Sequence, residues 1–145
     1  ADTLFGGDGA DRLIGGGAGD SLAGQGADDM LAGRSGNDTL DGGWGDDLLR
    51  GGGGDDLLRG GDGDDRLKGG DGADVFHFNA THDCGKDVVL DFDPDQDALR
   101  FVGIGAADLK ITDTGPHVRI AWETGQVTVK NTGPEDLPLD LFTFL

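Results

Sequence analysis

Gly60-Gly61-Asp62-Gly63-Asp64-Asp65-Arg66-Leu67-Lys68 is one copy of a nine-residue unit, and the next copy, which begins at Gly69, follows it directly. The unit repeats without insertion from Asp2 to Phe76. Each copy has an aspartate, and these are Asp2, Asp11, Asp20, Asp29, Asp38, Asp47, Asp56, Asp65 and Asp74. Two places after each aspartate stands a large apolar residue: Leu4, Leu13, Leu22, Leu31, Leu40, Leu49, Leu58, Leu67 and Phe76. Two columns in strict register indicate a repeat architecture.

The unit has two parts with different conformational demands. Its first six residues are rich in glycine, which adopts positive φ and allows tight turns, and its last three alternate as a short strand with the middle side chain inward. Two units then form one coil, and coils stacked about 4.8 Å apart pair their strands in parallel. We therefore predict an all-β fold, a right-handed parallel β-roll of nonapeptide repeats over residues 1–77, followed by a small antiparallel β cap over residues 78–145.

Composition limits the classes of partner. The chain has 145 residues and a net charge of -18, and 24 of its 30 glycines fall within residues 1–77. Such acidity argues against nucleic acid or an anionic membrane as a general partner, and no apolar run reaches the length of a membrane span. The single cysteine, Cys84, excludes an internal disulfide. Because the sequence opens inside a unit, we expect the C-terminal piece of a longer protein.

The aligned carboxylates point to a cation. Stacked turns place the aspartates of successive coils close together, where they repel one another, and they leave turn carbonyls without partners. Ca²⁺ takes 6–8 oxygen ligands from carboxylates and carbonyls, whereas Mg²⁺ retains its waters and requires a tight octahedron. We therefore expect a chain that is disordered without calcium and folded with it.

Residues 1–77 resemble the RTX (repeats-in-toxin) calcium-binding β-roll. The resemblance implies an ion between turns two units apart. The earlier turn supplies its second and fourth carbonyls and its aspartate, and the later turn supplies its first and third carbonyls and its aspartate. Eight complete turns form six such pairs, so about six ions or more are expected. The implied metal-binding residues are Gly7, Gly9, Asp11, Gly16, Ala18, Asp20, Gly24, Gly26, Asp29, Gly33, Ser35, Gly36, Asp38, Gly42, Gly43, Trp44, Gly45, Asp47, Gly51, Gly52, Gly53, Gly54, Asp56, Gly60, Asp62, Asp65, Gly69, Asp71 and Asp74.

Some units depart from the glycine pattern, and some outer positions are basic. Ala18 and Ala27 replace the fourth-place glycine, and Gln25 and Arg34 replace the second. On alternate strands the outward positions include Arg12, Arg50, Arg66 and Lys68. One interpretation is that these cations offset the turn carboxylates. The other is a site for an alginate-like polyanionic polysaccharide, since arginine suits carboxylate groups. This second hypothesis makes the chain a carbohydrate-binding accessory that resembles modules of mannuronan C5-epimerases.

Beyond the repeats the sequence reads as ordinary β structure. Strands are predicted at 87–92, 98–102, 108–112, 117–122 and 125–130, with turns at Gly115-Pro116 and Thr124-Gly125. The segment 87–99 resembles the one that follows the last repeat in secreted RTX proteases, lipases and alginate epimerases. The end, residues 136–145, resembles the acidic and then apolar tail of type I secretion substrates. These resemblances imply a secreted, extracellular protein that is exported by type I secretion machinery.

No catalytic constellation is evident in the sequence. Asp93, Asp95 and Asp97 do not form an EF-hand, because Ala98 stands where a glycine is needed and Ile104 where a glutamate is needed. A loop with an extra ion is the remaining interpretation. Residues 82–84, His-Asp-Cys, could suggest zinc, but adjacent ligands without a partner pair favour a surface loop. We therefore predict no enzyme activity here. The predicted role is a calcium-binding roll that folds after secretion and stabilises or assists the export of an upstream catalytic domain.

Overall fold

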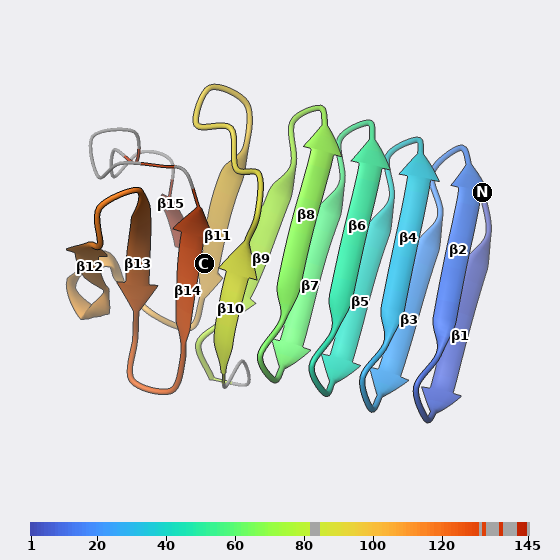
Figure 1. The fold of residues 1–145 in the computed structure, drawn as a ribbon, viewed down its shortest axis with the longest axis horizontal. Helices are drawn as coiled ribbons and strands as arrows, with labels where there is room; N and C mark the ends of the chain where they lie inside the picture. The colour runs from blue at the N-terminus through green and yellow to red at the C-terminus, as the bar shows by residue number, and fades with distance from the viewer. Residues whose placement is uncertain (82–84, 131, 133–136, 138–141, 145) are drawn as a thin grey trace.

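The computed structural model describes residues 1–81, 85–130, 132, 137 and 142–144. Within these residues the strands form two sheets that lie face to face (Figure 1). Sheet A has the order β1 (Thr3–Asp8), β3 (Ser21–Gly26), β5 (Thr39–Trp44), β7 (Leu57–Asp62), β9 (Val75–Asn79), β11 (Ala98–Val102), β15 (Phe142–Phe144). Sheet B has the order β2 (Arg12–Gly17), β4 (Met30–Ser35), β6 (Leu48–Gly53), β8 (Arg66–Asp71), β10 (Lys86–Val89), β14 (Gln126–Lys130), β13 (His117–Ala121), β12 (Lys110–Asp113). The predicted all-β parallel roll is confirmed.

Each strand of the roll pairs with the strand one coil further along the chain. Leu31 lies opposite Leu13 on one side and Leu49 on the other, and the same offset holds in sheet A. The leucines between the sheets form a single column that is almost inaccessible to solvent, with Leu31, for example, 0% exposed. This column is the core of the roll, because the inward position of each short strand is the one that faces the opposite sheet.

The strands are longer than the sequence predicts. Each roll strand spans six residues instead of three, since the first three residues of the following turn continue the pairing. In sheet A, for example, Gln25 pairs with Gly43 and Gly26 with Trp44. The glycine-rich backbone keeps its N–H and C=O groups aligned with the next coil, so three residues, such as 27–29, are left to reverse the chain.

The C-terminal region combines two kinds of pairing. Strands β10, β11 and β15 extend the two parallel sheets, while antiparallel pairing joins β14 to β13 and β13 to β12. The antiparallel part of the prediction is therefore confirmed, and both predicted turns lie in hairpins. Strand β15 was not predicted, because its residues were interpreted as a secretion tail. The division at residue 77 stays a prediction, and β9 crosses it.

An aromatic cluster fills the C-terminal end of the sandwich. Phe78 stacks on Phe101 with ring centroids 5.3 Å apart, and Trp122 contacts both rings. Phe142 and Phe144 of β15 lie against Phe101. These large residues cover the last coil, as the open end of a repeat array requires. The short 3-10 helix η1 (Ala106–Asp108) is exposed, and no helix in the described ranges is long and apolar enough to cross a membrane.

Candidate metal centres in the turns

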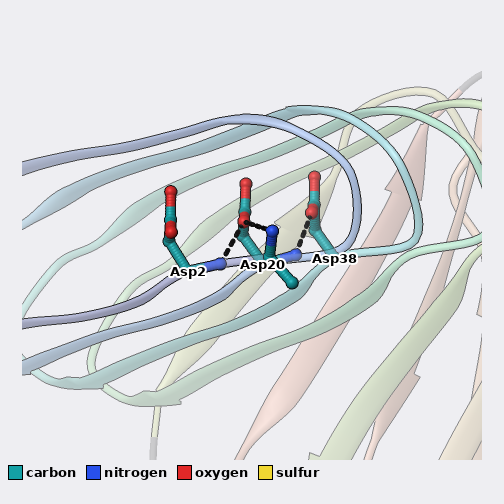
Figure 2. Close-up of polar contacts among 4 residues, drawn as sticks. Asp2, Asp20 and Asp38 are labelled. Carbon is teal, nitrogen blue, oxygen red and sulfur yellow. Dashed lines mark hydrogen bonds and ion pairs between the residues drawn. The ribbon is translucent and has the colours of Figure 1, made fainter.

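Two ladders of aspartates run along the edges of the roll, one at each row of turns. In each ladder the Oδ1 atom of an aspartate accepts the backbone N–H of the aspartate one coil earlier, at 2.6 to 3.0 Å. Figure 2 shows Asp2, Asp20 and Asp38 in one line, each carboxylate directed the same way. The terminal ammonium of Ala1 also lies 3.7 Å from Asp20 Oδ1.

The second carboxylate oxygen of these aspartates is buried and has no hydrogen-bond partner. This holds, among the described residues, for the Oδ2 atoms of Asp20, Asp29, Asp38, Asp47, Asp56 and Asp74. An unsatisfied buried carboxylate oxygen costs several kcal/mol, on the order of the penalty for burying a polar group without a partner. Two stacks of such oxygens therefore fit a row of cations, and the donor set of hard oxygens suits calcium.

Four of the ladder carboxylates have a pKa above the ordinary value of an aspartate, 3.8. The pKa of Asp47 is raised to about 7, mainly by burial. The N–H bond from Asp29 opposes this rise, and the neighbouring carboxylates of Asp65 and Asp29 contribute to it. Burial likewise raises the pKa of Asp56 to about 6. Burial also raises the pKa values of Asp38 and Asp74. A cation beside these groups would favour the charged form instead.

The first glycine of a turn has no side chain, and in several turns a carboxylate oxygen and a carbonyl oxygen lie where a Cβ atom would otherwise be. A Cβ atom built on Gly24 would collide with Asp29 Oδ2 and would lie 2.6 Å from the carbonyl oxygen of Gly42 in the next coil. The same two kinds of oxygen meet beside Gly42, Gly51 and Gly15. The aspartate of the earlier turn and the first-place carbonyl of the later turn, two of the expected ligands, therefore border one space.

The other expected carbonyls also lie between coils. The carbonyl oxygen of Ala27 lies 2.6 Å from the position that a Cβ atom on Gly45, one coil further, would take. The carbonyl oxygen of Gln25 lies in the same way beside Gly43. The third-place carbonyls differ, because that of Gly26 accepts the N–H of Gly9 at 3.2 Å. A carbonyl has a second lone pair, so this bond leaves one acceptor position for an ion.

The units that lack glycine keep the turn conformation. Ala18 and Ala27 have φ values of 69° and 72°, and Gln25 and Arg34 have values of 85° and 86°. Residues other than glycine pay roughly 1–2 kcal/mol for such left-handed conformations. The turns 15–20 and 24–29 therefore keep the positive-φ backbone of the neighbouring turns. The replacement of glycine by these residues adds conformational strain to the folded turn.

The C-terminal region continues both ladders, which the sequence analysis did not identify. Asp87 Oδ1 accepts the N–H of Asp65, and Asp97 Oδ1 accepts the N–H of Asp74. Asp91 adds a bond from the N–H of Gly69. The offsets are 22 and 23 residues instead of 18, so a search for a fixed period misses them. The only available signal was that Asp87 and Asp97 stand two residues before the inward Val89 and Leu99, as in the repeats.

Within the loop over residues 93–97, two carboxylates accept hydrogen bonds from the loop itself. Asp97 Oδ2 accepts the N–H of Asp93 at 2.8 Å, and Asp93 accepts bonds from Asp95 and Gln96. The extra ion suggested for this loop stays a prediction. Among the described residues no three Asp, Glu, His or Cys side chains gather around one point, so an ion in the turns would take most of its ligands from backbone carbonyls. The weak zinc candidate at 82–84 lies outside the described residues.

The four outward basic residues named in the sequence analysis, Arg12, Arg50, Arg66 and Lys68, do not all lie close together on sheet B. Arg50 and Lys68 lie opposite each other on β6 and β8 and line a shallow cavity of about 410 Å³. Arg66 shares β8 with Lys68. Arg12 stands apart on β2, because Met30 and Leu48 occupy its row on the two intervening strands. Three of the four cations therefore gather, and the fourth is isolated.

Comparison with known proteins identifies the repeats. The profile of the RTX calcium-binding nonapeptide repeat (4 copies) matches residues 1–22, 23–58 and 50–83. No match was found among curated proteins.

Several solved structures are similar to this fold. The extracellular lipase LipA from Serratia marcescens has a TM-score of 0.52 and 18% identity, over 94% of this chain and 40% of the lipase chain. The AlgE6R3 subunit of mannuronan C5-epimerase from Azotobacter vinelandii has a TM-score of 0.49 and 24% identity, over 93% of this chain and 80% of that one. The AlgE6R2 subunit of the same enzyme has a TM-score of 0.46 and 28% identity, over 90% of this chain and 93% of that one. This chain thus spans less than half of the lipase, with which it shares the fold.

Proposed function

The chain belongs to the family of RTX calcium-binding nonapeptide repeat proteins, and from this premise we propose that it is a folding module that calcium closes after export. The observation that carries the proposal is the double stack of buried Oδ2 atoms without partners. Without a cation, these like charges oppose the stacked structure. With calcium, the same atoms become ligands and the roll gains stability by linkage to binding.

We place the ions between turns two units apart, with the ligands expected from the sequence. For turns 24–29 and 42–47 these are the carbonyls of Gln25 and Ala27 with Asp29, and the carbonyls of Gly42 and Trp44 with Asp47. The space shared by Asp29 Oδ2 and the Gly42 carbonyl supports this placement. About six such pairs arise from the eight complete turns, and Asp87 and Asp97 add carboxylates for further ions at the C-terminal end.

The calcium concentrations of the two compartments support the direction of the switch. Extracellular calcium modules bind in the range of about 10⁻⁴–10⁻³ M, so the chain would stay open in calcium-poor cytosol and close outside. An open, strongly acidic chain suits passage through a type I secretion channel, and the closed roll then stabilises an upstream domain. In this proposal the chain is secreted and extracellular, has a structural role, and leaves catalysis to that domain.

Far-UV circular dichroism during a calcium titration tests the proposal. We expect a coil spectrum in chelator and a cooperative change to β structure with calcium, but not with magnesium at the same concentration. Asp47→Asn should raise the calcium midpoint about tenfold, because Asp47 belongs to two ion sites. Asp46→Asn is the matched control, since it removes the same charge from the adjacent exposed position and should leave the midpoint nearly unchanged. A full β spectrum in chelator would overturn the proposal.

A further inference from the structure

The outer face of sheet A carries one short basic row in a chain of net charge -18. Arg100 of β11 lies opposite His77 of β9. Arg59 follows the last paired residue of β7 and lies beside His77 on the other side. Each of the three alternates with buried residues of its own strand, so each points away from the core. We call Arg59, His77 and Arg100 the sheet A basic row, and adjacent members stand about 4.8 Å apart along the sheet.

Two nitrogen atoms of this row are buried and have no hydrogen-bond partner. They are Arg59 Nε and His77 Nδ1. Arg59 makes its ion pair through another atom, with Nη1 3.8 Å from Asp41 Oδ2, and within the described part of the chain Arg100 has no ion pair. The Nε of arginine always carries a proton, and Nδ1 carries one in the imidazolium form. A ligand that brings acceptor oxygens would therefore satisfy atoms that the protein leaves without partners.

The charges around His77 favour an anion. The groups that act on it are the guanidinium of Arg59 on β7 and that of Arg100 on β11, and β9 has no other charged residue. The pKa of His77 is lowered mainly by burial, and these two guanidinium groups contribute to the lowering. An anion held between the arginines would oppose both effects and favour the imidazolium form. The outward residues of the three strands include no carboxylate, and they are Leu57, Arg59, Gly61, Val75, His77, Asn79, Ala98, Arg100 and Val102.

We propose that the sheet A basic row binds one doubly charged tetrahedral oxyanion, a sulfate or phosphate group. Three donor side chains on adjacent strands match an anion that has oxygen atoms on several sides. A carboxylate has two oxygens in one plane, and a single arginine fork satisfies both. The row is also short, because Asp41 lies beside Arg59 on the next strand and would repel a longer polyanion. The site lies on the sheet opposite the basic residues of β6 and β8, and it goes beyond the proposed folding role.

Nuclear magnetic resonance of the calcium-loaded protein tests this site, with the ring of His77 as the reporter. Sulfate is the probe, because it leaves calcium in solution and keeps both charges between about pH 5 and pH 8, where histidine titrates. We expect saturable shifts of the His77 signals on addition of sodium sulfate, together with a rise in the pKa of His77. By linkage, sulfate should bind more tightly as pH falls through that pKa. Sodium chloride at equal ionic strength is the control, and acetate should bind at least about tenfold more weakly than sulfate.

Matched variants assign the donors. Arg100→Ala should weaken sulfate binding at least about tenfold, because it removes a charged donor. His77→Gln should weaken it about threefold at about pH 6 and should abolish its pH dependence. Asp41→Asn should tighten binding about twofold, since it releases Arg59 and removes a competing carboxylate. Arg66→Ala removes one positive charge from sheet B instead, and it should change sulfate binding by less than about twofold.

The outcomes separate this inference from the proposed folding role. Circular dichroism in calcium should show the same β spectrum for the parent and each variant. Shifts no larger than those with chloride, or equal losses for Arg66→Ala and Arg100→Ala, would overturn the site and leave the calcium proposal standing. Equal affinity for acetate would overturn the choice of a tetrahedral anion. Methyl phosphate distinguishes the source, because its binding would support an esterified group on a larger ligand, whereas binding of sulfate alone would support the free ion.

Discussion

Each strand of the roll from β2 to β8 buries one large apolar side chain, whereas β9, β11, β13 and β14 each bury two. The difference lies in the position two residues after the inward leucine. In the roll this position is the first-place glycine, and the space beside it holds an aspartate Oδ2 atom. In β9 the equivalent residue is Phe78, which is buried among Phe101 and Trp122. The same place in the coil therefore serves an ion site in one region and a hydrophobic core in the other.

This comparison explains why the two regions should differ in their need for calcium. A single column of leucines gives the roll a thin core, and its two carboxylate ladders oppose closure. The aromatic cluster at the C-terminal end contributes aromatic contacts worth about 0.5–1.5 kcal/mol per pair beyond area burial, in addition to the end of the two ladders. The C-terminal region thus offers strands β10 and β11 as edges on which β8 and β9 can pair in parallel.

Removing calcium should have the largest effect and should separate the regions. We expect chelation to raise amide hydrogen exchange in β2 to β6 by at least about 100-fold, and in β13 and β14 by less than about tenfold. Mass spectrometry of peptic fragments measures both. Trp44→Phe leaves Trp122 as the reporter of the aromatic cluster, and its emission should stay that of a buried indole. Equal loss of protection in both regions would mean that they fold as one unit.

Acidification should act on the roll more moderately. The folded-state pKa values of Asp47 and Asp56, about 7 and about 6, lie above the ordinary value of 3.8. A raised folded-state pKa stabilises the metal-free roll below pH about 4, and this contribution is lost as pH rises through about 6 to 7. Protons therefore compete with calcium, and the calcium midpoint should be higher at pH 5 than at pH 7.5. A midpoint independent of pH over this range would contradict the raised values.

The smallest expected effect concerns a single turn residue. Ala27→Gly should stabilise the calcium-bound roll by about 1 kcal/mol, because Ala27 has a φ of 72° that glycine adopts without strain. The opposite change at the equivalent place, Gly45→Ala, should cost more, since its Cβ would lie 2.6 Å from the carbonyl oxygen of Ala27. Thermal unfolding in excess calcium measures both. Destabilisation by Ala27→Gly would show that the turn conformation carries no strain.

The sequence alone determined the roll, its register and its ladders of aspartates. A strict period fixes these features, because each unit repeats the same local geometry and every coil meets an identical neighbour. Leu31 and Asp29 could be placed without coordinates for that reason. The strand lengths were underestimated, since pairing of the glycine backbone depends on the next coil and not on the side chains of the unit.

Only the tertiary structure decided what happens where the period ends. Asp87 and Asp97 join the ladders at irregular offsets, because loops of other lengths bring them back to the same edges. Phe142 and Phe144 form a strand, since β11 presents a free edge and an aromatic surface. Arg119 and Lys130 come to lie on the same sheet as the basic residues of β6 and β8 through the pairing of β10 with β14. Contacts between residues so far apart in the chain leave no periodic trace, and they depend on how the sheets close.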